Sequence, residues 1–396
     1  MKRRVLYLDV PFENESGGDK NRSRFLWQTL RAHYQADLVL LGREGAGPRP
    51  MWTHFKPLAV LGPQPSRFPH PASTPAFRPS DHALFSTLLR DGKYDLILSR
   101  FCTGWELCQR AGQTAPDTRV VVDVDMLSSR LVALAWRAQR TLRRRWFLFE
   151  KWKLQRFEKR LFRQPWLFLF TNATELAQVR DQIAPRPASG EFTLVPNTMP
   201  QAAELQGVER KPVILFFGSM DSAANADAFA FLLDGVIPEV KSHLKLHGVE
   251  VHIVGKNPPS QFHERLMRSG MQSVKIIGGV DSIERAIAES LFVLLPLRVA
   301  SGTRTRILEA AAQRRAVITT SIGVEGLDLG DTLLIGENAG DLARHAHRLL
   351  EHPEQADVLG RRLQERAFSL YTADRVASDL VQVLERLAVR PQGGQK

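Results

Sequence analysis

Residues 292–313 read FVLLPLRVASGTRTRILEAAAQ, a strand, a loop and a helix from which the architecture of the second half of the chain can be built. The apolar run Phe292–Leu295 predicts a buried strand, and Thr303–Gln313 predicts a helix after a loop of small residues. Free amides at the start of such a helix bind anions. Arg304 and Arg306 lie in its first turn against the helix dipole, which indicates a phosphate ligand.

Glu309 lies one to two turns into the same predicted helix, with the small-residue run Ala310–Ala312 behind it. That run allows the helix to pack closely on a sheet. A carboxylate at this place can accept hydrogen bonds from the vicinal hydroxyls of a ribose, as acidic residues do in dinucleotide sites. The alternative is a surface glutamate that pairs with Arg306 or Gln313 on an ordinary helix.

Short apolar runs alternate with amphipathic stretches on both sides of this segment, which is typical of a parallel sheet covered by helices. The predicted strands of the second half are 212–217, 249–254, 274–277, 292–295, 316–319 and 333–335, and the predicted helices are 225–233, 260–267, 282–288, 303–313, 341–350, 354–368 and 375–387. In the first half the predicted strands are 5–9, 36–41, 96–99, 120–124 and 166–171, with a helix at 23–34. We therefore expect an α/β protein with two Rossmann-like domains.

The chain of 396 residues divides naturally into two domains and a terminal helix. The predicted bounds are 1–200 for the first domain, 201–372 for the second and 373–396 for a helix that crosses back to the first. Residues 57–79 hold seven prolines and are interpreted as a surface insertion in the first domain.

Composition excludes several classes of protein. Hydrophobic residues make up 43% and charged residues 24%, which is ordinary for a globular protein. No apolar run reaches the length of a membrane-spanning helix, and the apolar run after Lys2 is too short for a signal peptide, so we expect a cytoplasmic protein. Two cysteines cannot form a disulfide framework, and the eleven histidines lack metal-ligand spacing, so no metal or cofactor is expected.

The basic residues are concentrated in one segment. Residues 130–163 hold twelve Lys or Arg and two acids, in a chain whose net charge is +12. Trp146, Phe149 and Trp152 recur there at helical spacing. One interpretation is a cationic helix that lies on an anionic membrane surface. The other is a pair of core-packed helices with a solvated arginine face.

The run Gly302-Thr303-Arg304-x-Arg306-x-x-Glu309-Ala310, followed by Gly323-Val324-Glu325-Gly326-Leu327, resembles the nucleotide-sugar-binding half of GT-B glycosyltransferases of family four. The resemblance continues through Phe217-Gly218-Ser219-Met220, Val254-Gly255 and Ile277-Gly278-Gly279-Val280, and is closest to bacterial polysaccharide and exosortase-associated sugar transferases. It covers residues 211–372 well and the first half more thinly.

The resemblance implies a donor site and a set of contacts for it. The site would use Gly218, Gly302, Thr303, Arg304, Arg306 and Glu309. In the first half, Gly17, Gly18 and Lys20 are similar to the glycine loop and helix start beside the donor phosphates. The sequence also departs from the family pattern. Ser301 stands where many members have a first glutamate, Arg306 replaces the usual lysine, and no basic residue follows the first strand of the second domain. Phosphate charge would then be met by Arg304, Arg306 and either Lys20 or Arg22.

Asp123 and Asp125 follow an apolar run at the end of a predicted strand and are the candidates for acceptor contact or for a general base. Their alternative role is to cap a helix after Ser128. The resemblance implies transfer with retention of anomeric configuration, with the leaving diphosphate stabilised by arginines and a helix terminus without metal.

These patterns predict a glycosyltransferase that moves a sugar from a nucleotide-diphosphate sugar to a glycan or lipid-linked acceptor, in the cytoplasm or peripherally on the inner membrane face. No nucleic-acid partner is expected. Two alternatives stay open: a GT-B epimerase or phosphorylase, and a non-catalytic protein whose basic segment holds nucleotides or nucleic acid.

Overall fold

The computed structural model describes residues 2–10, 18–42, 57–61, 76–130, 132–133, 144–183, 190–201, 205, 207–220, 223–299, 302 and 304–389. The chain forms two compact units. Unit 1 comprises Met1–Thr198 and Ala373–Lys396, and unit 2 comprises Met199–Thr372. The terminal helix therefore belongs to the same unit as the first 198 residues.

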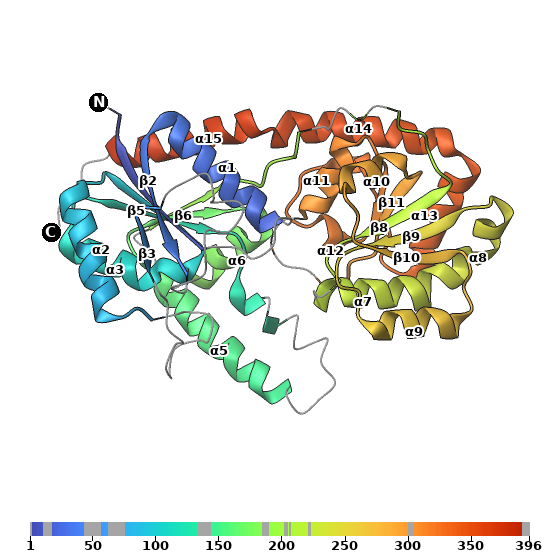
Figure 1. Ribbon diagram of the computed structural model, residues 1–396, viewed down its shortest axis with the longest axis horizontal. Coiled ribbons are helices and arrows are strands. Elements are labelled where there is room, and N and C mark those ends of the chain that lie inside the picture. Colours follow the sequence, from blue (N-terminus) through green and yellow to red (C-terminus); the bar gives the residue numbers. More distant parts are fainter. Residues whose placement is uncertain are drawn as a thin grey trace. The chain divides into compact units, whose positions relative to one another are not determined.

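Unit 1 is built on a parallel sheet of seven strands in the order β3-β2-β1-β4-β5-β6-β7 (Figure 1). The strands are β1 (Arg4–Asp9), β2 (Gln35–Leu41), β3 (Ala59–Leu61), β4 (Leu96–Arg100), β5 (Arg119–Val124), β6 (Leu167–Phe170) and β7 (Glu191–Leu194). The central strands are buried on both faces, as continuous apolar runs in parallel sheets are.

Helices cover both faces of this sheet. Leucines and valines of α1 (Gly18–His33) and α15 (Ala373–Val389) pack with sheet residues in one core, and Arg3 forms an ion pair with Glu385 of α15 at 2.6 Å. The opposite core contains residues from the helices α2 (Pro79–Gly92), α3 (Trp105–Thr114), α5 (Arg144–Leu161) and α6 (Ala173–Ile183). A short 3₁₀ turn, Cys102–Gly104, precedes α3.

Unit 2 repeats the plan with a parallel sheet of six strands in the order β10-β9-β8-β11-β12-β13. The strands are β8 (Val213–Phe217), β9 (Glu250–Val254), β10 (Val274–Gly278), β11 (Phe292–Leu295), β12 (Val317–Thr319) and β13 (Leu334–Ile335). The helices are α7 (Ala223–Phe231), α8 (Ile237–Leu246), α9 (Ser260–Ser269), α10 (Ile283–Glu289), α11 (Thr305–Ala312), α12 (Ser321–Val324), α13 (Ala339–Glu351) and α14 (Pro353–Tyr371), with a π-helical turn at Leu232–Val236 and a 3₁₀ turn at Gly330–Thr332.

The strands predicted from apolar runs are all present, and no predicted bound differs from the observed one by more than one residue. The sequence patterns did not reveal β7, α2, α3, α6 or α8, whose segments are short or lack a clear period. The interpretation of 57–79 as a surface insertion is wrong for its described part. Residues Ala59–Leu61 pair with β2 in parallel and form the edge of the sheet, and Phe77 is buried. The proline content concealed a short apolar strand; residues 62–75 lie outside the described part.

Within the described residues, no helix is both long and apolar enough to cross a membrane. Cys102 and Cys108 are free thiols.

Candidate active site

In unit 2, one arginine reaches the carboxyl end of the first strand. Arg306, in the first turn of α11, donates from Nη1 to the carbonyl oxygen of Phe217 at 2.8 Å, where β8 ends. Burial lowers the pKa of Arg306 to about 10, and the attraction of Glu309 offsets only part of this effect. The guanidinium stays charged at neutral pH, but its surroundings supply less negative charge than a buried cation requires.

Gly218 shapes the same end of the strand. Its φ is +152°, a value that favours glycine, and a Cβ at this position would lie 2.6 Å from Nη1 of Arg306. A Cβ on Gly255, at the end of β9, would overlap the carbonyl oxygen of Gly218. A ligand could therefore approach the backbone at the ends of β8 and β9 closely, beside the guanidinium of Arg306.

Asn225 contributes a polar atom with no partner. Its side chain is 6% exposed, and its amide nitrogen donates to the carbonyl oxygen of Ser219 at 2.5 Å. The side-chain oxygen is buried and accepts no hydrogen bond from any described residue. Buried polar atoms are ordinarily satisfied, so this oxygen is a candidate acceptor for a ligand hydrogen bond. Asn225 was not among the residues predicted for the site.

Glu309 lies one turn after Arg306 on α11 and is partly buried. Burial raises its pKa to about 7, which the charge of Arg306 only partly counteracts. Glu284 of α10 adds a smaller repulsion. Arg306 and Glu309 thus form an incompletely compensated pair.

Arg304 takes a different direction from Arg306. It precedes α11, is 5% exposed, and donates from Nε to the carbonyl oxygen of Ile322 at 3.2 Å and from Nη1 to that of Gly302. Its Nη2 lies 3.9 Å from a carboxylate oxygen of Glu325. Its guanidinium thus ties the loop before α11 to the segment around α12. The helix itself begins two residues later than the sequence predicted, at Thr305.

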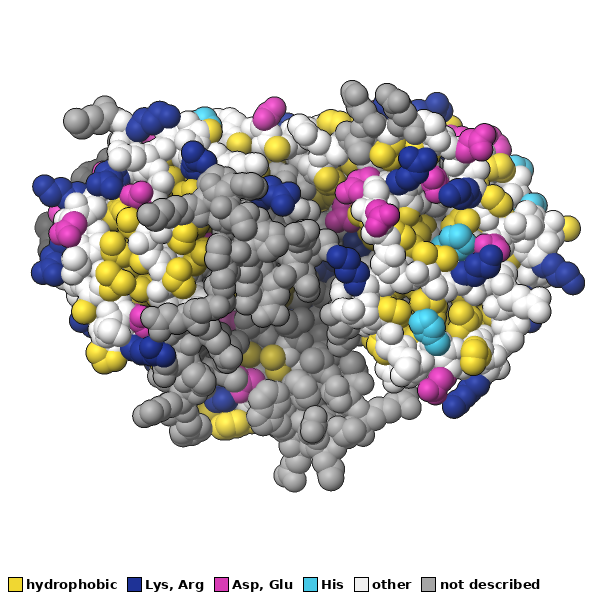
Figure 2. Space-filling model, in the orientation of Figure 1, with side chains coloured by type: hydrophobic (Ala, Val, Ile, Leu, Met, Phe, Trp, Pro, Cys, Tyr) yellow, Lys and Arg dark blue, Asp and Glu magenta, His cyan; other side chains and the backbone are white. Residues whose placement is uncertain are grey.

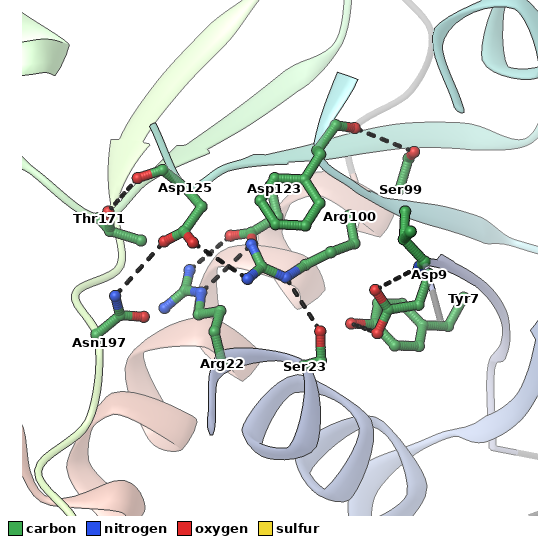
Figure 3. Close-up of polar contacts among 12 residues, drawn as sticks. Tyr7, Asp9, Arg22, Ser23, Ser99, Arg100, Asp123, Asp125, Thr171 and Asn197 are labelled. Carbon is green, nitrogen blue, oxygen red and sulfur yellow. Dashed lines mark hydrogen bonds and ion pairs between the residues drawn. The ribbon is translucent and has the colours of Figure 1, made fainter. Parts of the chain in front are cut away.

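In unit 1, the carboxyl ends of β4 and β5 carry a buried network of two arginines and two aspartates (Figure 3). Arg100 donates to Asp123 at 2.8 Å and to Asp125 at 3.2 Å. Arg22, from α1, binds the other oxygen of Asp123 at 2.6 Å. The side chains of both arginines and of Asp123 are fully buried. Burial lowers the pKa of Arg100, but Asp125 and Asp123 more than offset this and raise it above its usual value.

The network extends to the end of β1. Asp9 is fully buried, accepts from the Tyr7 hydroxyl at 2.9 Å and from the Val10 amide at 2.7 Å, and has its pKa raised by burial to about 6 despite the attraction of Arg100. Arg100 also donates from Nε to the Ser23 hydroxyl at 3.3 Å. Charged and polar groups from three neighbouring strands therefore meet at one edge of the sheet (Figure 3).

The same network holds the segment that follows β7. Arg22 donates to the carbonyl oxygen of Pro196 at 2.8 Å, and the Asn197 amide approaches Asp125 at 3.5 Å. The Thr171 hydroxyl donates to the Asp125 carbonyl oxygen at 2.9 Å. The end of the first 198 residues is thus fastened to the carboxyl ends of β5 and β6.

These contacts determine where the predicted residues of unit 1 lie. Asp123 is fully buried between two guanidinium groups, whereas Asp125 is 4% exposed. Asp123 does not cap the helix after Ser128, because both of its carboxylate oxygens bind guanidinium groups. At the start of that helix the amides of Leu127 and Ser129 donate to Glu175 and Glu158.

The remaining predicted residues lie partly outside the described structure. Gly18 begins α1, and Gly302 is buried with φ +72°. Gly17, Thr303 and the side chain of Lys20 lie outside the described residues. The suggestion that Arg22 meets donor phosphate is wrong for this structure, since its guanidinium is occupied by Asp123 and Pro196.

Arg100 was missed from the sequence. An arginine that closely follows the apolar run Leu96–Leu98 was the available signal, because a charged residue at the end of a buried strand needs partners there.

Comparisons with known proteins agree with this architecture. Residues 211–352 match the family model described as glycosyl transferases group 1. Among curated proteins, none matches the sequence significantly. A glycosyltransferase from Rickettsia africae ESF-5 has a similar structure, with a TM-score of 0.70, 10% sequence identity, and coverage of 98% of this chain and 100% of that chain.

Two further solved structures cover nearly the whole chain. Anabaena HepE in complex with UDP and glucose has a TM-score of 0.68 at 14% identity, covering 97% of this chain and 100% of that chain. Sucrose-phosphate synthase from Thermosynechococcus elongatus has a TM-score of 0.68 at 15% identity, covering 98% and 99%.

The two parallel sheets and these structural matches define a GT-B fold. Unit 2 carries a group 1 glycosyltransferase domain, and the chain is a glycosyltransferase.

Proposed function

We propose that this glycosyltransferase takes its sugar from a nucleoside-diphosphate donor bound at the carboxyl edge of the sheet in unit 2. The observation that carries the proposal is Arg306, a partly buried cation at the end of β8 whose guanidinium, among the described residues, donates to a backbone carbonyl oxygen and to no carboxylate. A pyrophosphate would supply the missing negative charge. The similar Anabaena HepE structures are complexes with UDP and with UDP-glucose, which supports a donor of this class.

Other groups at this edge suit the rest of such a donor. Glu309, one turn along α11, can accept hydrogen bonds from ribose hydroxyls in its ionised form. The unpaired oxygen of Asn225 can accept from a hydroxyl or an amide of the ligand. Gly218 allows the diphosphate to approach the backbone closely.

The proposed chemistry is transfer with retention of configuration. Arg306 and the amides at the start of α11 would stabilise the charge that develops on the leaving diphosphate, so the scheme needs no metal. We assign acceptor binding to unit 1, with Asp125 rather than Asp123 as the carboxylate nearest to solvent in the buried network. The proposed acceptor is a glycan or lipid-linked glycan of a bacterial surface polysaccharide or glycoconjugate, met at the cytoplasmic face of the membrane.

The donor class can be tested with a panel of UDP-, GDP-, dTDP- and CMP-sugars, following thermal unfolding and release of the nucleotide. One base series should raise the melting temperature and be hydrolysed slowly without acceptor. Glu309→Ala should abolish the thermal shift, whereas Glu354→Ala, which removes an exposed glutamate of α14, should retain it.

Absence of any shift across the panel would contradict the proposal. Binding to duplex DNA that persists at about 200 mM salt would instead support the alternative of a nucleic-acid-binding protein.

A further inference from the structure

Helix α5 has two faces of very different character. Leu154, Phe157 and Leu161 are buried in the core of unit 1. The only two acids of the helix, Glu150 and Glu158, are also buried, with 3% and 4% exposure. The outward face of the described part of the helix therefore carries no carboxylate.

Both acids are engaged on the inner side. Glu158 accepts a hydrogen bond from the Ser129 amide at 2.9 Å, and burial raises its pKa to about 7. Glu150 forms an ion pair with Lys153 at 2.5 Å. These acids cannot balance the basic residues that face outward farther along the helix.

The outward face begins with large apolar side chains. Leu148, Phe149 and Trp152 are 48%, 46% and 49% exposed, and the two rings stack with centroids 5.9 Å apart. In Figure 1 the beginning of α5 extends away from the sheet of unit 1, whereas its end lies against it. Packing against the sheet does not require three exposed large apolar side chains at the outer end of the helix, and such a cluster is typical of an interaction surface.

Basic residues follow the apolar ones along the same face. Arg156 lies over the Trp152 ring at 5.0 Å, and Lys159 and Arg160 are exposed one turn farther. In the described part of the chain, no carboxylate is within ion-pair distance of these three side chains. Unit 2 differs in that many of its exposed arginines pair with acids, as Arg366 does with Asp328 at 2.8 Å. Figure 2 shows its basic and acidic side chains interspersed.

An apolar tip followed by unpaired cations on one helical face fits an anionic lipid bilayer. The aromatic rings can enter the boundary between headgroups and acyl chains, while the cations attract the lipid phosphates. A nucleic-acid duplex would use the cations but offers no apolar phase to the exposed side chains of Leu148 and Trp152.

We propose that the outward face of α5, formed by Leu148, Phe149, Trp152, Arg156, Lys159 and Arg160, docks this protein on an anionic membrane surface. The inference rests on the proposed function only in that a lipid-linked acceptor would lie in the same surface. The docking itself requires no donor or acceptor.

The test is co-sedimentation of the full chain with phosphatidylcholine vesicles, with and without about 30 mol% phosphatidylglycerol. The wild type should bind the anionic vesicles much more strongly. The double variant Arg156→Glu/Lys159→Glu should lower the partition coefficient by about 25-fold or more, because each basic residue near the surface contributes about fivefold. Trp152→Ala should lower it by about tenfold.

Leu246→Ala is the matched control, since it removes an apolar side chain that is 77% exposed in unit 2 and should leave binding unchanged. Circular dichroism should show that all variants melt like the wild type. The proposal is overturned if the wild type ignores anionic vesicles, or if the α5 variants bind as the wild type does. It is also overturned if these substitutions abolish DNA binding but not vesicle binding.

Hydrolysis of the donor without lipid separates this inference from the proposed function. The α5 variants should hydrolyse donor at the wild-type rate. Loss of vesicle binding with intact hydrolysis supports docking through α5, whereas vesicle binding without any donor hydrolysis leaves docking intact and contradicts the proposed donor.

Discussion

Each unit places an arginine side chain where a central strand of its parallel sheet ends, fully buried for Arg100 and partly buried for Arg306, and the two side chains have different surroundings. Arg100 of unit 1 binds two aspartates, which raise its pKa although it is fully buried. Arg306 of unit 2 binds one carbonyl oxygen, and burial lowers its pKa to about 10.

The difference indicates that the charge of Arg100 stabilises the fold, whereas the charge of Arg306 is available to bind an anionic ligand. A buried charge is costly unless nearby charges and hydrogen bonds compensate it. Unit 1 supplies these partners from its own chain, so its network stabilises the fold. Unit 2 leaves the compensation incomplete, and an anionic ligand that provides it would bind tightly at that point.

The largest expected effect comes from Arg100→Met. It leaves Asp123 and Asp125 buried without their shared cation, and should lower the free energy of unfolding of unit 1 by about 3–5 kcal/mol. All seven tryptophans lie in residues 1–198, so denaturant unfolding followed by tryptophan fluorescence reports on unit 1 alone. A variant as stable as the wild type would show that the network is not structural.

Glu309→Gln should make the stability of unit 2 less dependent on pH. The pKa of Glu309 is raised from 4.5 to about 7, so the folded state binds its proton more tightly than the unfolded state. This contribution is fully present below pH 4.5 and is lost as pH rises through about 7; it amounts to about 3 kcal/mol at most.

The measurement is thermal unfolding by circular dichroism at several pH values without ligand, in the transition that tryptophan fluorescence does not report. Between pH 5 and 8 the wild type should lose more stability than Glu309→Gln, while Glu354→Gln on α14 should follow the wild type. Parallel curves for all three proteins would mean that Glu309 is not held at a raised pKa.

Arg306→Met is the counterpart of Arg100→Met and should have the opposite effect on stability, together with a loss of nucleotide affinity. It removes a partly buried charge with few compensating partners, so unit 2 should unfold at the same denaturant concentration or a higher one. It also removes the charge-assisted contact to the donor diphosphate, worth about 1.5–3 kcal/mol, so nucleotide affinity should fall by about 10- to 100-fold.

Isothermal titration with the nucleotide that gives the largest thermal shift measures this effect. Arg285→Met is the matched control: Arg285 is an exposed arginine of unit 2, paired with Glu289 on the same helix, and its replacement should leave affinity unchanged. Unchanged nucleotide affinity in Arg306→Met would contradict the claim that Arg306, unlike Arg100, binds a ligand.

The smallest effect is expected from Gly218→Ala. The added methyl group would force Arg306 and Asn225 aside and place alanine at φ +152°, for a loss of about 1–2 kcal/mol in the stability of unit 2 and weaker nucleotide binding. Gly112→Ala in α3 meets no atom within 4 Å and should be neutral or slightly stabilising. Equal behaviour of the two variants in melting and titration would show that the Gly218 position is not constrained.

Much of the fold was accessible from sequence because continuous apolar runs in a parallel sheet stand out from their surroundings. The run at 292–295 coincides with β11, and the helix that follows differs from its prediction by two residues at its start. Residues 59–61 were missed because prolines on both sides hid a three-residue strand. The helix α8 was missed because it continues from the π-helical turn before it without a break in composition.

The candidate site was predicted in part. Arg306 was identifiable because a positive side chain in the first turn of a helix opposes the dipole and needs a reason to be there. Glu309 was identifiable because it follows one turn later on the same predicted helix. Arg304 and Arg306 could not be distinguished from sequence, since their side-chain directions depend on where α11 begins and on what lies at the end of β8. The partners of Asp123 come from residues 22 and 100, and no local pattern joins those positions.

By itself, the sequence determined that this protein is an α/β chain with two sheets and a concentrated basic segment, and it predicted an anion site at one helix start, because hydrophobic period, charge and turn residues are local properties. Only the tertiary structure decided which arginine at a strand end has its charge balanced by aspartates: Arg100 does, and Arg306 does not. It also decided which face of α5 turns its acids inward and its aromatic and basic side chains outward. Compensation and exposure depend on groups that are far apart in the chain and meet only when the sheets form.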